Sequence, residues 1–266
     1  MASETHADTF KVQGDDVVAG NDPGRINIFY MVVPFENKFK TFVLTRRQYY
    51  SESGINQVIK RSNHWNLAVK VQLDALSCVS TKGVSVDSHL AYLEVYHRHR
   101  EAMWGEYLRP RWARQRLSLY AGKQRVFARF FNVVAKELRD AFPNKRIVIA
   151  YGSAKFASGG PNEVSVPTSR AYKECATRFT TVVTPEFRTS KVYNVNDELL
   201  HLVAVKGAQH ALRGVLWSTE HRRFVSRDLN AAINIRRKLL DRPAILDPKN
   251  ADGPLKQKIR KRINPR

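Results

Sequence analysis

Cysteine is scarce in this chain of 266 residues. Cys78 and Cys175 are its two cysteines, and 97 positions separate them. Such a pair provides neither a disulfide framework nor a four-cysteine zinc site. The scarcity fits a reducing, intracellular environment best.

Long apolar runs are also missing. No stretch of about 18 apolar residues occurs, and this argues against a membrane-spanning helix. The first residues, Met-Ala-Ser-Glu-Thr-His-Ala-Asp, lack the basic-then-apolar pattern of a signal peptide. We therefore expect no membrane partner and no secretory route.

Acidic residues are outnumbered by basic ones. The chain has 45 Lys and Arg against 24 Asp and Glu, which leaves a net charge of +21. A surplus of this size favours a polyanionic partner, most commonly nucleic acid, with an anionic membrane surface as the weaker alternative. The hydrophobic share of 43% is that of a globular protein with a real core.

The order of apolar runs predicts an α/β fold. Three strand-like runs within 16–24, 27–33 and 39–44 form a β-meander, and a helical pattern then extends over about 45–142. A continuous apolar run at 146–152 reads as a central buried strand. A fifth strand at 179–184 and an amphipathic helix from Ser226 follow. Strands interrupted by a long helical segment leave several α/β folds open.

Two short motifs suggest a family. Ser226 begins Ser-Arg-Asp-Leu-Asn-Ala-Ala-Ile-Asn-Ile, where Asp228 stands in the first turn of a helix with a stripe of Leu229, Ala232 and Ile233. Asp22 lies in Gly-Asn-Asp-Pro-Gly-Arg-Ile-Asn-Ile-Phe. Taken singly, Asp228 reads as a first-turn carboxylate and Asp22 as a turn residue. Together the motifs resemble the last and first RuvC motifs of the TnpB and Fanzor nucleases, transposon-encoded relatives of RNA-guided effectors.

The resemblance implies a fold and a set of catalytic residues. The fold would be RNase H-like (RuvC), with a large helical insertion after the third strand. Residues 1–14 would be a flexible N-terminus, 15–240 the nuclease domain and 241–266 a basic tail. Asp22, Glu186 and Asp228 would hold Mg²⁺ or Mn²⁺, since two-metal phosphodiester cleavage needs carboxylates from separate elements.

The second acid departs from the usual family pattern. The central strand ends Ile-Ala-Tyr-Gly, without the expected Glu. Part of the family has a replacement Glu before a Thr-Ser run, and Pro185-Glu186-Phe-Arg-Thr-Ser resembles it. Glu186 is therefore our candidate, with Glu163 second and Glu174 also nearby.

The family's zinc ribbon looks degenerate at 190–225. The positions that match its cysteines hold Tyr193, Asn196, Ser218 and His221. Zinc requires four thiolate or imidazole ligands, so we expect no structural zinc and a hairpin that depends on packing. The core we expect for it contains Val192, Leu200, Leu202, Leu212, Val215, Leu216 and Trp217.

A basic segment in the helical insertion is the candidate nucleic-acid surface. Between 98 and 146 the chain has 13 Lys and Arg against four acids. Cations fix a phosphate backbone while aromatic rings stack on unpaired bases, although a solvated helix face is the plain alternative. The residues we assign to binding are Arg109, Arg111, Trp112, Arg114, Arg116, Lys123 and Arg125.

Two functions compete at this point. One is a metal-dependent DNA endonuclease domain of TnpB or Fanzor type, with DNA and a guide RNA as partners. A separate chain could then supply the family's N-terminal half, which the sequence lacks. The other is a catalytically decayed, transposon-derived nucleic-acid-binding protein. We expect a nuclear location in a eukaryote and a cytoplasmic one otherwise.

Overall fold

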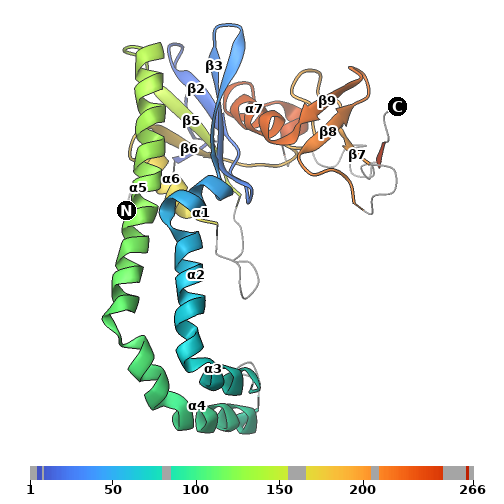
Figure 1. The fold of residues 1–266 in the computed structure, drawn as a ribbon. Helices are drawn as coiled ribbons and strands as arrows, with labels where there is room; N and C mark the ends of the chain where they lie inside the picture. Colours follow the sequence, from blue (N-terminus) through green and yellow to red (C-terminus); the bar gives the residue numbers. More distant parts are fainter. Residues whose placement is uncertain are drawn as a thin grey trace. The chain divides into compact units, whose positions relative to one another are not determined.

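The chain divides into two compact units in the computed structural model (Figure 1). The structure describes residues 5–7, 9–79, 85–154, 166–204, 210–247 and 262–263. Met1–Arg46 and Phe127–Arg266 form one unit, here called the sheet unit, and Arg47–Val126 form the other, here called the helical unit.

The sheet unit is built on a mixed sheet of six strands in the order β1-β6-β5-β2-β3-β4. The strands β2, β3 and β4 form an antiparallel meander, while β2, β5, β6 and β1 are parallel. Their bounds are β1 Thr5–His6, β2 Val17–Asn21, β3 Asn27–Phe35, β4 Lys38–Thr45, β5 Ile147–Gly152 and β6 Thr180–Thr184.

The α/β prediction is confirmed, since all five predicted strands form where the apolar runs occur. The strand β1 is a difference from the expected flexible N-terminus. It pairs with β6, and Ala7 after it is buried at 6% exposure. Residues 1–4 and 8 of that segment lie outside the described part of the chain.

Helices cover both faces of the sheet. The helix α7 (Arg227–Leu240) packs its apolar stripe of Leu229, Ala232 and Ile233 against β3, as the sequence predicts. On the other face lie α6 (Thr168–Ala176) and the second half of α5 (Pro110–Ala141). There Phe29 of β3 makes edge-to-face contacts with two phenylalanines of α5. The sheet is therefore a central layer with an α7 face and an α5 face.

Gly20 of β2 lets α7 approach closely. A Cβ atom added at Gly20 would lie 2.0 Å from the carbonyl oxygen of Ala232 and 2.9 Å from the Cβ of Arg236. A clash with backbone cannot be relieved by a rotamer change, so a side chain here would push the helix away. This contact fixes α7, and the residues at its start, against β2.

The helical unit contains α1 to α4 and the first half of α5. The bounds are α1 Arg46–Ser53, α2 Ile55–Trp65, α3 Lys70–Ser77 and α4 Val86–Tyr107, with a 3₁₀ turn at Asn66–Val69. The helix α5 starts at Pro110, which occupies the first helical position. Proline is well suited to that position because its missing N–H would have no helical partner. Gln115 of α5 donates a hydrogen bond of 2.9 Å to Ser62 of α2.

A second sheet follows β6 in the sheet unit. Its strands are β7 His201–Val203, β8 Val215–Ser218, β9 Arg223–Ser226 and β10 Arg262–Ile263, in the order β10-β7-β8-β9. Its inner face packs Tyr193, Leu200, Leu216 and Val225 together, with Leu202 against them. Leu212, expected in this core, is 44% exposed. Of the predicted basic tail, 248–261 and 264–266 lie outside the described residues, while Leu246 is buried after α7.

No helix in the described ranges is long and apolar enough to cross a membrane.

Candidate active site

Asp22 follows directly after the last residue of β2. Side chains alternate along a strand, and Val18 and Gly20 both face α7, so Asp22 points to the same face. Its backbone N–H donates a hydrogen bond of 2.9 Å to the Tyr30 carbonyl. Because β2, β5 and β6 are parallel, their carboxyl ends meet at one edge of the sheet, which is where ligands bind in open α/β sheets.

Glu186 reaches the same edge from the loop after β6. A Cβ atom added at Gly152, the last residue of β5, would lie 2.0 Å from Oε1 of Glu186. The carboxylate thus occupies the space that a side chain at the end of the central strand would fill. The backbone N–H of Ala154 donates a hydrogen bond of 3.0 Å to the same oxygen. Gly152, at the end of the central strand, makes room for Glu186.

Asp228 enters from the first turn of α7. Its Oδ2 accepts a hydrogen bond of 2.7 Å from the side-chain amide of Asn27, at the start of β3. Ser226 precedes the helix as predicted, but its hydroxyl does not cap the helix. That hydroxyl instead forms a side-chain hydrogen bond with Tyr30. Asp228 and Ser226, the residue before α7, are thereby both tied to β3.

The three carboxylates influence one another electrostatically. Burial first, and then the negative charges of Glu186 and Asp228, raise the pKa of Asp22 to about 8, against the opposing charge of Arg227. Burial also raises the pKa of Glu186, against the Ala154 hydrogen bond, Arg227 and Lys238. A carboxyl group that loses its water and faces other carboxylates favours its neutral form. Residues from β2, the β6 loop and α7 therefore share one local field.

The carboxylates fit a hard divalent cation by chemistry. All three are oxygen donors from separate elements, and a cation would relieve the repulsion that raises the pKa of Asp22. Among the residues that the structure describes, however, no three His, Cys, Asp or Glu side chains gather closely enough to form a ready metal cage. Binding of an ion would have to draw these carboxylates together.

Two asparagines of α7 position the Glu186 loop, and sequence reasoning missed them. The side-chain amides of Asn230 and Asn234 both donate to the carbonyl oxygens of Thr189 and Val192, over distances of 2.7–3.2 Å. Thr189 in turn donates from its hydroxyl to the Glu186 carbonyl over 3.1 Å. Both asparagines are buried, at 1% and 0% exposure. The available signal was two polar residues spaced i, i+4 within the apolar stretch of the helix.

The alternative second acids lie elsewhere. Glu174 stands on α6, where its carboxylate pairs with Arg170 at 2.7 Å and with Arg178 at 3.0 Å. Its charge is thus already satisfied by neighbours on the α5 face of the sheet. Glu163 lies outside the described residues.

The four positions that match zinc ligands do come together. The rings of Tyr193 and His221 meet edge to face at 5.3 Å. Ser218 accepts a hydrogen bond of 3.1 Å from the backbone N–H of His221, and it donates its hydroxyl to Glu198. Asn196 bonds with Glu220 beside them. Hydrogen bonds around Glu198 and the contact between Tyr193 and His221 therefore connect the segments 193–198 and 218–221.

Part of the predicted nucleic-acid surface serves the helical unit internally. Trp112 packs edge to face on Trp65 at 5.0 Å, and its indole N–H donates to Glu106 over 3.0 Å. Arg111 bonds with Glu106 and covers Trp65, and Arg109 pairs with Glu106 at 3.3 Å. Glu106 is 3% exposed, and these hydrogen bonds, with that of Arg111 first, lower its pKa.

The remaining predicted binders are more accessible. Lys123 is half-buried, whereas exposed side chains are found at Arg114, Arg116 and Arg125. All seven assigned residues stay a prediction, and these four cations are the ones without a bond to Glu106.

Comparison with known proteins identifies similar folds. No protein-family model matches the sequence, and no curated protein sequence does. A solved structure of the mini-RNA-guided endonuclease CRISPR-Cas_phi3 aligns with a TM-score of 0.51 and 12% identity, covering 87% of this chain and 46% of that one. A cryo-EM structure of CasPhi-2 (Cas12j) bound to crRNA aligns with a TM-score of 0.49 and 13% identity, covering 84% of this chain and 48% of that one.

These matches concern the fold alone. The chain spans about half the length of the two solved proteins. The mixed sheet with its large helices is consistent with the RNase H-like expectation.

Proposed function

We propose that this chain is the RuvC-like nuclease region of an RNA-guided DNA endonuclease related to TnpB and Fanzor. The observation that carries the proposal is that three motif carboxylates share one sheet edge, near enough for the charges of Glu186 and Asp228 to raise the pKa of Asp22, with Glu186 in the space left by Gly152. The fold shared with an RNA-guided endonuclease supports it. The proposed partners are DNA and a guide RNA, in keeping with the net charge of +21.

Each carboxylate has a distinct part in the proposal. Asp22 and Asp228 would hold Mg²⁺ or Mn²⁺ on the α7 face, and Glu186 would complete the set of oxygen ligands from the β6 loop. Such ions activate water and stabilise the charge that develops on the phosphate. Asn27 would keep Asp228 oriented through its hydrogen bond, and Asn230 and Asn234 would hold the loop that carries Glu186.

The test is cleavage of labelled single-stranded DNA by the purified chain, with Mg²⁺ or Mn²⁺ and with chelator. Asp22→Ala and Asp228→Ala should each reduce cleavage by about 100-fold or more, since they remove stabilisation of the transition state. The matched control is Asp140→Ala, an exposed acid on α5, which should cut like the parent. Cleavage that continues in chelator, or in either site variant, would assign the activity to something else.

A catalytically decayed binding protein is the second candidate. The absence of a ready metal cage among the described residues favours it. The same incubation separates the two candidates. Salt-sensitive binding without any cleavage, in either metal, would select the binding protein.

A further inference from the structure

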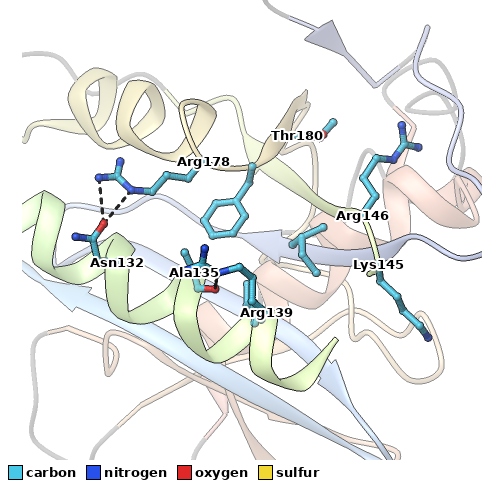
Figure 2. A pocket seen from close by; sticks show the side chains of 10 residues that line it. Asn132, Ala135, Arg139, Lys145, Arg146, Arg178 and Thr180 are labelled. Atoms are coloured by element: carbon cyan, nitrogen blue, oxygen red, sulfur yellow. Dashed lines mark hydrogen bonds between the residues drawn. The ribbon is translucent and has the colours of Figure 1, made fainter. Parts of the chain in front are cut away.

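A pocket of about 470 Å³ lies on the α5 face of the sheet unit (Figure 2). One wall is the last turns of α5, and the other is the start of β5 and of β6 with the residues before them. Figure 2 shows Asn132 and Arg178 at one end, Lys145 and Arg146 at the other, and Arg139 between them. Its lining is Asn132, Ala135, Leu138, Arg139, Lys145, Arg146, Ile147, Arg178, Phe179 and Thr180.

The pocket is cationic. Four of its ten lining residues are basic, and none of those in the described part of the chain is acidic. Arg146 is held from behind by Asp16, through bonds of 2.7 and 2.6 Å, and Arg178 by Glu174 at 3.0 Å. Arg139 donates its Nε to the Ala135 carbonyl over 3.2 Å, and Lys145 has no ion-pair partner within the described residues. Arg139 and Lys145 therefore bring charge that no lining acid neutralises.

The helix dipole of α5 does not help this pocket to attract an anion, so the attraction comes from the side chains. Arg139 stands in the last turn of α5, where the helix dipole is negative and disfavours an anion. Arg139 and Lys145 outweigh that partial charge, because each carries a full unit of positive charge. The pocket is thus an anion site made by side chains.

Its floor is apolar. Leu138 is fully buried there, and Ala135, Ile147 and Phe179 complete the surface. An inorganic ion would leave this apolar area unused. A phosphate joined to a flat ring would use both parts, because bases stack on aromatic side chains while cations hold the backbone. The volume is within the range of pockets that hold such molecules.

The pocket is separate from the carboxylates. Asp22 and Glu186 lie at the carboxyl ends of the parallel strands on the α7 face, whereas the pocket lies at the starts of β5 and β6 on the α5 face. A strand six residues long spans about 20 Å. Whatever occupies the pocket is therefore not the phosphate at the carboxylates.

We propose that this pocket holds one nucleotide of a nucleic-acid strand, remote from the cleavage centre. Arg139 and Lys145 bind its phosphates, and Phe179 contacts its base. The inference rests on the proposed function only in taking nucleic acid as the polyanion. The pocket anchors a strand, and it has no part in the chemistry at Asp22.

The first experiment measures binding of a labelled single-stranded oligonucleotide by fluorescence anisotropy, in chelator and over a series of salt concentrations. Arg139→Gln with Lys145→Gln removes both cations. The slope of log affinity against log salt falls by about 0.7 for each lost phosphate contact, so it should fall by about 1.4. The matched control is Lys136→Gln with Lys173→Gln, two exposed lysines of the sheet unit outside the lining.

The control should keep the parent slope within about 0.3, well below the drop of about 0.7 that one lost phosphate contact would cause. An equal fall of the salt slope in both double variants would show that the positive charge attracts the strand diffusely, and it would overturn the proposed pocket site. Because the assay contains chelator and needs no cutting, a catalytically dead chain can still bind as proposed. An active nuclease whose slope is unchanged by Arg139→Gln with Lys145→Gln would refute the pocket alone.

The second experiment tests the base. Phe179→Leu keeps apolar volume but removes the ring, and it should weaken binding of an ordinary strand about fivefold or more. Binding of an abasic strand should not change. A free mononucleotide that competes as well as the strand would mean that the pocket takes a small ligand, and this too would overturn the proposal.

Discussion

Asn230 and Asn234 share two acceptors, so their replacement should be strongly non-additive. In Asn230→Ala, the carbonyls of Thr189 and Val192 keep the amide of Asn234, at 2.9 and 2.7 Å. In Asn234→Ala they keep the amide of Asn230, at 3.2 and 2.7 Å. Only the double variant leaves both buried carbonyls without either donor.

The expected losses in the free energy of unfolding follow from the polar groups that each variant leaves unpaired. Asn230→Ala also removes the acceptor of the Asn194 N–H, at 3.0 Å, and should cost about 1–3 kcal/mol. Asn234→Ala removes a 3.1 Å bond from Arg237 and should cost about 1 kcal/mol. The double variant adds two unpaired carbonyls, so we expect it to exceed the sum of the single losses by about 1–3 kcal/mol.

Urea unfolding followed by circular dichroism measures these free energies. The control cycle combines Asn230→Ala with Asn132→Ala on α5, whose side chain accepts from Arg178 and shares no acceptor with Asn230. That pair should add within about 0.5 kcal/mol. If Asn230→Ala and Asn234→Ala also add within that margin, the two carbonyls are not shared and the account of the Glu186 loop is wrong.

Three further predictions concern the carboxylates and the ribbon. Because the pKa of Asp22 is about 8 in the fold and near 4 in the unfolded chain, the folded state binds this proton more tightly. The free energy of unfolding, measured by urea titration in chelator, should therefore fall as pH rises from about 5 to 8. Asp22→Asn should flatten that fall. Equal pH profiles of the parent and the variant would contradict a buried carboxyl at Asp22. Gly152→Ala places a Cβ 2.0 Å from the Glu186 carboxylate and 2.8 Å from Cδ of Pro23, so cleavage should be lost and the melting temperature should fall, because the proline ring cannot turn aside as the Glu186 side chain can; full activity would mean that the place of Glu186 is unimportant. Elemental analysis should find no stoichiometric zinc, since Tyr193, Asn196 and Ser218 offer no thiolate, and one tightly held zinc per chain would refute this.

The sheet and α7 could be predicted from the sequence because their signals are local. Apolar runs bounded by turn residues gave the meander and the central strand, and a 3.6-residue stripe gave the face that α7 buries. The acids could be chosen because each stands at the end of such an element. Strand order and the meeting of Asp22 with Glu186 are not local. The strand order was not predicted, and the choice of Glu186 came from resemblance; the structure supplies a physical reason for that choice in the empty side-chain position of Gly152.

The helical unit contains a buried contact that composition does not reveal. Arg109-Pro-Arg-Trp reads as a binding surface because cations and an aromatic ring alternate there. One buried acid, Glu106, also bonds with Arg109, Arg111 and the Trp112 indole, and the role of these residues in binding stays a prediction. No local sequence pattern predicts that a single glutamate will be buried. The basic pocket was missed for a related reason, because Arg139 and Arg178 come from segments far apart in the chain.

The contacts of α7 with β2 and β3 can form only late in the synthesis of this protein. Arg236 donates to the Val18 carbonyl across 218 residues, and Asn27 donates to Asp228 across 201. At 5–20 residues per second, a ribosome needs roughly 10–40 s to pass from β2 to α7. Until α7 is made, the α7 face of the nascent sheet, where Val18 is joined later by Val148 and then Val182, has no helix to cover it. The last carboxylate arrives with the helix that completes the core, so a chain released early has neither a closed fold nor a complete set of acids.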